Sequence, residues 1–199
     1  MPPLYAHDPF LVIQGALANP WLDAPMETLS VSCEGWALGI LVALLAIWFE
    51  KQPRRAVRAA LPALVALGLG GIVVTVVKHL LALPRPAAVL GEQRVRVLLE
   101  PLLYNSFPSG HAVALGIVAA YFTARYGWQA APLWLFALAG AMARVYVGAH
   151  WTIDVAAGLA LGSLIGLAAW LISRRAARAS AAQSLCRDGL EQTVAGDPT

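Results

Sequence analysis

Five long runs of apolar residues follow one another along the chain, with short polar stretches between them. They cover residues 31–49, 59–83, 111–126, 131–147 and 153–172. A helix needs ~20 mostly apolar residues to cross the hydrocarbon core of a bilayer. The pattern therefore predicts an all-α fold, a polytopic integral-membrane bundle of five spans that forms one domain over residues 1–175.

The two ends of the chain do not follow this pattern. Residues 9–30 mix apolar side chains with Pro20, Asp23, Pro25 and Glu27, and this mixture predicts an amphipathic segment at the membrane interface rather than a span. The polar residues 176–199 are expected to form a flexible cytoplasmic tail. The N-terminus lacks the basic region of a cleavable signal peptide, so the first span is expected to direct insertion.

Composition supports the membrane assignment. The chain is 59% hydrophobic and 13% charged, whereas about a quarter of the residues of a soluble domain are charged. Cys33 and Cys186 are far apart and lack the spacing of metal ligands, so neither a disulfide framework nor a zinc site is expected.

The basic residues follow the first, third and fifth spans, which predicts the orientation of the chain. With five spans, these three positions fall on one side, and the positive-inside rule makes that side cytoplasmic. The N-terminus, the 84–110 loop and the turn at His150 would then lie on the outer, periplasmic face of the inner membrane. The basic residues concerned are Lys51, Arg54, Arg55, Arg58, Arg125, Arg174, Arg175, Arg178 and Arg187.

Three basic residues, Lys78, Arg85 and Arg144, lie at predicted outer ends of spans, against this rule. Ionisable residues inside membrane segments are costly and are functional candidates by default. The other exceptions are expected to form a mixed-charge loop; they are Arg94 and Arg96, near Glu92 and Glu100.

Small residues are expected to let helices pack closely. Gly158, Gly162 and Gly166 recur every four positions in the last span, which is the small-xxx-small pattern of membrane helix pairs. The same interpretation applies to the second span, with Gly68, Gly70 and Gly71. The aromatic residues near span ends are expected to lie in the interfacial belt or to wall the site; these are Tyr104, Tyr146 and Trp151.

Three short segments bring chemistry to the outer ends of the helices. Lys78 and Arg85 are seven residues apart, so on a continuous helix they would point the same way. The segment 108–111 reads Pro-Ser-Gly-His and opens a helix, whose first N–H groups form a site for an anion such as phosphate. His150 and Asp154 are four residues apart and share a helix face, so the carboxylate can hold one imidazole nitrogen.

Together these segments offer three cations, a helix N-terminus, two histidines and one carboxylate. Phosphoryl transfer through a covalent phosphohistidine needs this set: cations and amides for the phosphoryl oxygens, one imidazole as nucleophile and another as proton donor. Only one acidic residue, Asp154, belongs to the set, whereas a two-metal phosphatase needs several carboxylates. We therefore expect a metal-independent enzyme with no cofactor.

The three segments resemble the signature motifs of a known family. Lys78-x6-Arg85-Pro86, Pro108-Ser109-Gly110-His111 and Arg144-x5-His150-x3-Asp154 are similar, in order, to those of the type 2 phosphatidic acid phosphatase superfamily, which includes vanadium-dependent haloperoxidases. The resemblance covers residues 78–154. It implies that His150 is the nucleophile, that Asp154 orients it and that His111 is the general acid. It also implies a phosphate-binding set of Lys78, Arg85, Ser109, Gly110 and Arg144.

The chain departs from the family pattern in two places. The third motif usually begins Ser-Arg, but Ala143 precedes Arg144 here, so a hydroxyl contact to phosphate is lost or comes from elsewhere. Membrane members of the family often have six spans, and the N-terminal segment would have to replace the missing one.

The resulting hypothesis is a membrane lipid phosphatase whose partners are a phosphorylated lipid and the bilayer, not a nucleic acid. Undecaprenyl diphosphate is the preferred substrate, ahead of phosphatidic acid, phosphatidylglycerol phosphate and lipid A phosphates. A phosphotransferase that passes the phosphoryl group to a lipid or sugar is one alternative. A non-enzymatic lipid binder or transporter is another, although it would not need His111, His150 and Asp154.

Overall fold

The computed structural model describes the backbone of residues 2–91, 93–99 and 103–195, with side chains as far as residue 183. The described residues form helices and connecting loops, without a β-strand. In chain order the elements are η1 (Pro3–Tyr5), α1 (Phe10–Leu17), α2 (Pro20–Ser32), α3 (Gly35–Glu50), α4 (Pro53–Leu81), α5 (Pro86–Leu90), α6 (Gly110–Tyr126), η2 (Gly127–Ala130), α7 (Pro132–Tyr146) and α8 (Thr152–Ala195).

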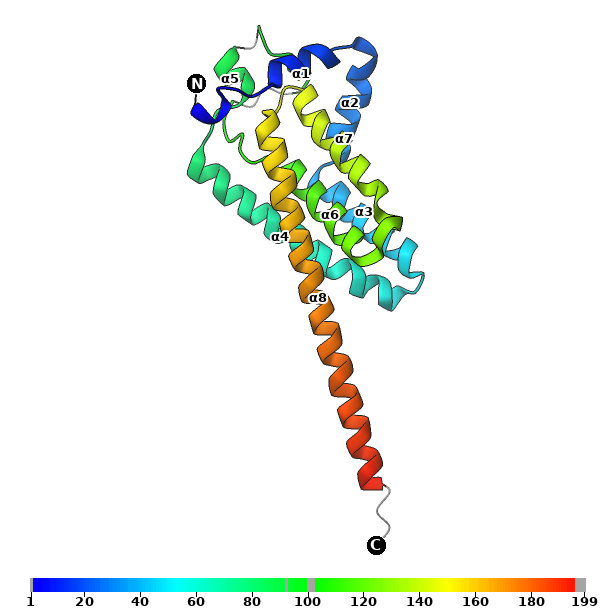
Figure 1. Ribbon diagram of the computed structural model, residues 1–199. Helices are drawn as coiled ribbons and strands as arrows, with labels where there is room; N and C mark the ends of the chain where they lie inside the picture. Colours follow the sequence, from blue (N-terminus) through cyan, green and yellow to red (C-terminus); the bar gives the residue numbers. More distant parts are fainter. Residues whose placement is uncertain (1, 92, 100–102, 196–199) are drawn as a thin grey trace.

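Helix α6 is the centre of the bundle. It packs against α3, α4, α7 and α8, and its most extensive contact is with α8 (Figure 1). Most of its side chains are buried, from Ala112 to Phe122. Because α6 begins in the Pro-Ser-Gly-His segment, the most deeply buried helix of the molecule also carries part of the candidate site.

Glycines on α8 allow its close approach to α6. A Cβ atom at Gly162 would lie 2.0 Å from the backbone oxygen of Val113, and one at Gly166 would lie 2.5 Å from that of Ile117. At Gly158 the nearest atom would be the Ser109 oxygen at 2.7 Å. The prediction of close packing through these three glycines is confirmed.

The glycines of α4 behave differently. Gly70 does face α6, since a Cβ there would lie 2.7 Å from the Ile117 side chain. Gly68 and Gly71 have no atom within 4 Å of such a Cβ. For these two residues the packing prediction is wrong: they line a cavity, and the absence of a side chain leaves space in it.

The membrane character of the fold is clear, but the number of spans is not set by helix length alone. Within the described residues, two segments are long and apolar enough to cross a bilayer: Pro53–Leu90, which includes α4, and Thr152–Gln183 of α8. Helices α2 and α3 would make a third span together, although they meet at 75°. Helix α7 is apolar but shorter. The count of five spans stays a prediction.

The N-terminal region is more ordered than its sequence suggested. Pro20–Ser32 is one helix, not a broken segment, and it packs on α7. Asn19 caps it by accepting a hydrogen bond from the Trp21 N–H, and Pro20 occupies the first turn, where a missing N–H costs nothing. Residues expected to interrupt the segment therefore start a helix. The chain breaks later, at Cys33 and Glu34, inside the predicted first span.

The loop after α5 is tied to this N-terminal region. Arg96 forms an ion pair with Asp23 of α2, and its guanidinium also donates to the Tyr146 hydroxyl. The prediction of a mixed-charge loop missed this long-range partner. Glu92 and Glu100 lie outside the described residues, as do the side chains of Cys186 and Arg187.

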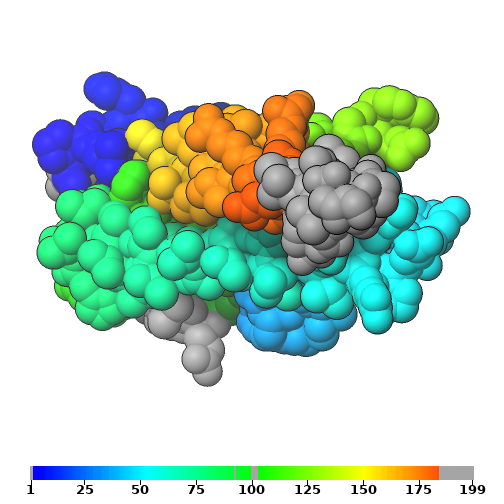
Figure 2. Space-filling model, turned by 90° about the horizontal axis from the view of Figure 1, so that it is seen from below, coloured from blue at the N-terminus to red at the C-terminus, as the bar shows by residue number. Residues whose placement is uncertain are grey.

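Several of the basic residues predicted to share one side lie together at one end of the bundle. Arg125, in the last turn of α6, pairs with Glu50 at the end of α3 at 2.7 Å. Arg174 and Arg178 of α8 line the same cavity as these two residues. Beyond this end α8 continues alone to Ala195, so the predicted tail is helical over 176–195 (Figure 1). Seen along this direction, α4 lies across the width of the molecule beside α8 (Figure 2).

Candidate active site

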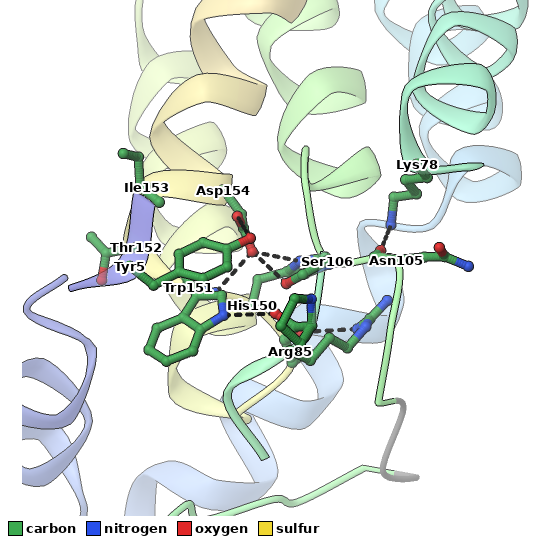
Figure 3. Close-up of polar contacts among 12 residues, drawn as sticks. Tyr5, Lys78, Arg85, Asn105, Ser106, His150, Trp151, Thr152, Ile153 and Asp154 are labelled. Carbon is green, nitrogen blue, oxygen red and sulfur yellow. Dashed lines mark hydrogen bonds and ion pairs between the residues drawn. The ribbon is translucent and has the colours of Figure 1, made fainter. Parts of the chain in front are cut away.

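The other end of the bundle brings the predicted site residues together. Lys78 lies in the last turn of α4, Arg85 at the start of α5, Ser109 to His111 at the start of α6, Arg144 in the last turn of α7, His150 in the α7–α8 turn, and Asp154 in the first turn of α8. Six of these residues line one cavity: Lys78, Arg85, Gly110, His111, Arg144 and His150. Sequence segments far apart thus form a single site (Figure 3).

The loop before α6 fixes Arg85 and Lys78 with backbone carbonyls. Its residues pair with the chain after α4, through the Arg85 N–H to Leu103 and the Ser106 N–H to Leu83. The Arg85 guanidinium donates to the carbonyl oxygens of Tyr104, at 3.0 Å, and Ala149, at 2.9 Å. These neutral acceptors hold the side chain in place and leave its positive charge uncompensated.

Lys78 is held in the same way. Its ammonium group donates to the carbonyl oxygen of Asn105 at 2.9 Å (Figure 3). Asn105 has a left-handed backbone conformation, with φ of 59°, which Asn tolerates better than most residues. The loop conformation therefore points a carbonyl, and not a carboxylate, at the lysine.

Arg144 forms a side-chain hydrogen bond with a residue of the N-terminal region. Its Nη1 donates to the hydroxyl of Ser30, a fully buried residue of α2. Ala143 carries no hydroxyl, and Ser30 supplies one to the neighbouring arginine from a different helix. Nothing in the sequence signalled this contact, because Ser30 and Arg144 are separated by 114 positions.

His150 is placed by a tight turn between α7 and α8. The Ala149 N–H donates to the Arg144 carbonyl, at 3.1 Å. Gly148 has φ of 76°, and a Cβ there would lie 2.6 Å from the Arg96 oxygen, so both its backbone conformation and its surroundings require glycine. The turn buries the imidazole to 2% exposure.

Asp154 is the most heavily bonded side chain of the site. Its Oδ1 accepts from the Tyr5 hydroxyl at 3.1 Å, and its Oδ2 accepts from the Ser106 hydroxyl and from the Trp151 N–H at 3.1 Å (Figure 3). The His150 Nδ1 lies 3.5 Å from Oδ2, outside ordinary hydrogen-bond distance but close enough to interact electrostatically. The spacing of four residues predicted that these two side chains are neighbours, as they are here, but the His150 Nδ1 has no hydrogen-bond partner among the described residues, and the spacing did not predict the donors to Asp154.

Two aromatic residues near the site are not exposed at an interface. Trp151 and Tyr146 are each 1% exposed. The Trp151 indole donates to the Pro84 carbonyl, and the Tyr146 hydroxyl donates to Asp23. The interfacial-belt prediction is wrong for both, because each ring packs inside the protein, whereas Tyr104 is exposed.

The charges of the site are strongly unbalanced. Within the described part of the chain, Lys78, Arg85 and Arg144 form no ion pair with a carboxylate. Burial lowers the pKa of the His150 imidazole well below its ordinary value, and the charges of Arg85, Lys78 and Arg144 lower it further. The lowered pKa favours the neutral form of the His150 imidazole, in which one ring nitrogen carries a lone pair.

Several buried polar atoms lack a partner among the described residues. They include the Ser109 hydroxyl, the His111 Nε2 and the Arg144 Nε. Buried polar groups are normally hydrogen-bonded, so each exception calls for an explanation. A phosphate group held near the start of α6 offers acceptors to all three kinds of donor.

The cavity itself has two characters. Its volume is about 620 Å³, and the site residues form one end. Most of the remaining walls are small or apolar residues of α4 and α6, which are Leu67, Gly68, Gly71, Val74, Val113, Ala114 and Ile117; Gly35 of α3 and the hydroxyl-bearing Thr75 of α4 complete the lining. Arg85, His111 and Arg144 also line a second cavity of about 270 Å³, so each of them faces two cavities.

The side chains do not form a cluster suited to a resident metal ion. Within the described residues, no group of three or more His, Cys, Asp and Glu side chains could hold one. The ionisable groups that line the cavity are cations and imidazoles. Their charge suits an anion.

Fold and site together define an all-helical integral-membrane protein with a cluster of cationic side chains and imidazoles at one end of its bundle. The sequence profile of the PAP2 superfamily matches residues 59–178, and the chain belongs to this superfamily. The match contains all three sequence motifs.

Individual relatives agree with this assignment. The undecaprenyl-diphosphatase BcrC of Bacillus subtilis (strain 168) is 33% identical over 132 residues, which are 62% of this chain and 62% of BcrC. A lipid A 1-phosphatase of Rhizobium johnstonii is 38% identical over 77 residues, covering 36% of this chain and 30% of the relative. The chain therefore spans less than two thirds of the length of these relatives.

A solved structure shares the fold over most of the chain. The crystal structure of Aquifex aeolicus LpxE aligns with a TM-score of 0.66 and 28% sequence identity. The alignment covers 83% of this chain and 92% of LpxE.

Proposed function

We propose that the protein hydrolyses the phosphate or diphosphate group of a membrane lipid through a phosphohistidine intermediate. The observation that carries this proposal is the two-part cavity, with cations and histidines at one end and apolar helix faces along the rest. An amphiphile fits such a cavity with its phosphate at the polar end and its tail along α4 and α6. A water-soluble phosphate ester would leave the apolar walls without a partner.

In the first step, the Nε2 of His150 attacks phosphorus, since its Nδ1 faces Asp154. The bond from phosphorus to the leaving oxygen breaks as the new N–P bond forms. His111 donates a proton to the leaving oxygen, and the positive charge that develops on His150 is stabilised by Asp154. The negative charge of bound substrate offsets the three cations, which favours the protonated form of His111 that this step needs.

In the second step, neutral His111 takes a proton from water, and the resulting hydroxide attacks the phosphohistidine. The N–P bond breaks, inorganic phosphate is released and His150 returns to its neutral form. Lys78, Arg85 and Arg144 bind the phosphoryl oxygens in both steps, with the Ser109 hydroxyl and the amides at Gly110. No step requires a metal ion.

Undecaprenyl diphosphate is the preferred substrate. The relative with the longer match is an undecaprenyl-diphosphatase, and space beside Gly68 and Gly71 suits a branched isoprenoid chain. Lipid A 1-phosphate is the alternative, supported by the Rhizobium relative and by the alignment with LpxE.

We place the site on the outer face of the inner membrane. The support is the distribution of basic residues, since Arg125, Arg174 and Arg178 gather at the opposite end of the bundle. Attachment of a membrane-impermeant reagent, in intact cells, to a cysteine introduced at Tyr104, an exposed position before α6, would test this orientation. Labelling only after permeabilisation would contradict it.

The activity is tested by phosphate release in detergent from undecaprenyl diphosphate, phosphatidic acid, phosphatidylglycerol phosphate and lipid A. We expect release from at least one of them, and a loss of at least about 10³-fold in His150→Ala, which lacks the nucleophile. Equal rates in the two proteins, or no release from any lipid, would contradict the proposal.

The place of the lipid tail has its own test. Gly71→Leu would fill part of the cavity, and Ile72→Leu is the matched control on the next, outward-facing position. We expect Gly71→Leu to lower kcat/KM for the long-chain lipid about tenfold and to spare isopentenyl diphosphate, which has a short chain. Equal effects on both substrates would place the tail elsewhere.

A further inference from the structure

The first residues of the chain reach Asp154, the neighbour of His150, although they lie outside the family match, which begins at residue 59. Tyr5 is fully buried, and its hydroxyl donates to Oδ1 of Asp154 across 149 positions of sequence. Figure 3 shows the Tyr5 ring beside Asp154 and Trp151. The Tyr5–Asp154 hydrogen bond has no role in the two proposed steps of phosphoryl transfer.

Aromatic packing fixes the position of the Tyr5 ring. It stacks on Trp151 with ring centres 4.6 Å apart and an angle of 14°, and Phe10 meets the same indole edge-on at 5.5 Å. Burial raises the pKa of the Tyr5 phenol far above its ordinary value, and the negative charge of Asp154 raises it further. The hydroxyl therefore keeps its proton and remains a donor at any pH at which the enzyme works.

Asp8 fastens the same segment to the start of α8. Its carboxylate accepts from the backbone N–H groups of Thr152, at 3.2 Å, and Ile153, at 2.9 Å. It also accepts from the N–H of Phe10 at 2.9 Å. A carboxylate at a helix N-terminus stabilises that helix, and here it comes from a distant part of the chain. Asp8 thus keeps Tyr5 close to the turn that carries His150.

We propose that Tyr5, anchored by Asp8, is a positioning residue that holds the Asp154 carboxylate in the orientation needed by the His150 nucleophile. This inference rests on the proposed function. Tyr5 binds Oδ1, while Ser106 and the Trp151 N–H bind Oδ2, the oxygen that lies 3.5 Å from His150. With both oxygens held, the carboxylate cannot rotate away from the imidazole.

Loss of the Tyr5 hydroxyl has two effects, and both act in the same direction on the pH profile. Oδ1 would be buried with no described donor, so the ionised carboxylate would be less stable and would bind a proton more readily. Its charge would also be less dispersed, so it would stabilise a protonated His150 more strongly. The active form has an ionised Asp154 and a neutral His150. As the pH falls, both changes would cause this form to be lost at a higher pH than in the unmodified protein.

Other charged groups around the imidazole must be unchanged for this comparison. The charged or titratable groups that interact electrostatically with His150 or with Asp154 come from five different parts of the fold. They are Asp8, Lys78, Arg85, His111 and Arg144. Tyr5→Phe removes one oxygen atom and keeps the ring, its stacking and every one of these charges. It therefore isolates the hydrogen bond.

The test compares the pH dependence of kcat and kcat/KM in Tyr5→Phe and in Phe10→Leu, which alters the same aromatic cluster without a contact to Asp154. For Tyr5→Phe we expect kcat to fall about tenfold with little change in KM. We also expect the acidic limb of the profile to move up by about half a pH unit or more. Phe10→Leu is expected to lower the melting temperature without moving the limb.

Two outcomes would overturn the inference: an unmoved limb in Tyr5→Phe, or an equal shift in Phe10→Leu. A second measurement does not depend on the substrate. The rate at which diethyl pyrocarbonate modifies His150, followed by mass spectrometry against pH, reports the imidazole directly, and its midpoint should rise in Tyr5→Phe. If no lipid released phosphate, the proposed function would fail while this measurement still decided the role of Tyr5.

Discussion

The two ends of the bundle both carry arginines, but these side chains have opposite surroundings. At the end away from the site, Arg125 pairs with Glu50 at 2.7 Å and also bonds Tyr126. At the site, Arg85 binds two carbonyls and Arg144 binds the Ser30 hydroxyl, with no carboxylate partner among the described residues. A count of basic residues does not separate the two ends, whereas the kind of acceptor does. Neutral acceptors fix a cation and leave its charge for a ligand.

The largest expected effect comes from removing one of these uncompensated charges. Arg144→Gln keeps a side chain that can bond Ser30 but loses the charge, so kcat/KM for lipid hydrolysis should fall by about 10² to 10³. Arg125→Gln, at the opposite end, should stay within about twofold, because its partner is Glu50 and not substrate. Initial rates of phosphate release at several lipid concentrations measure both.

The functional difference between the two ends would be contradicted if Arg125→Gln lost activity as severely as Arg144→Gln while both proteins kept their melting temperature. Such a result would mean that charge at either end serves the whole fold rather than the site. Similar loss of activity with a collapse in melting temperature for Arg125→Gln alone would still leave Arg144 as the functional cation.

A smaller effect is expected at Ser30, which touches Arg144 but not the reacting atoms. Ser30→Ala removes the hydroxyl that orients the guanidinium, and we expect KM to rise about three- to tenfold with a lesser change in kcat. Ser30→Thr retains the hydroxyl and should recover most of the loss. The KM and kcat of both variants are obtained from the same lipid assay. If Ser30→Ala changed only the melting temperature, the residue would serve packing alone.

The smallest effect is expected from metal removal. In the proposed mechanism side-chain cations bind the phosphate, so EDTA should change the rate by less than about twofold. Dialysis against EDTA followed by an assay with and without added Mg²⁺ measures this. A rate that disappears with EDTA and returns with Mg²⁺ would contradict the phosphohistidine route.

The parts of the site that the sequence predicted are those with local spacing. His150 and Asp154 are four apart on a helix start, and the Pro-Ser-Gly-His segment marks a helix N-terminus, so simple helix geometry predicts both. The motif order then linked these segments to Lys78 and Arg85, and the structure places both cations around one cavity with Gly110, His111 and His150. Charged residues in apolar segments were conspicuous because such placements are costly.

The contacts that could not be predicted join distant positions without any repeating pattern. Ser30 lies at the end of residues 9–30, the segment whose prolines and acidic residues suggested interruption, and Tyr5 lies before it. Neither residue stands out in the sequence, and their partners lie more than a hundred positions away. The glycines show the same limit. Gly162 and Gly71 look alike in sequence, yet one lies against a neighbouring helix and the other faces a cavity. Only the paths of the neighbouring helices distinguish them.

The role of His150 as nucleophile is tested most directly by trapping its phosphorylated intermediate. Undecaprenyl diphosphate labelled with ³²P in its terminal phosphate would be mixed with enzyme and quenched in alkaline detergent within the first turnover. We predict a protein-bound, alkali-stable and acid-labile label on the peptide that contains His150, and none in His150→Ala. Turnover without protein-bound label, or label on another residue, would contradict the central claim.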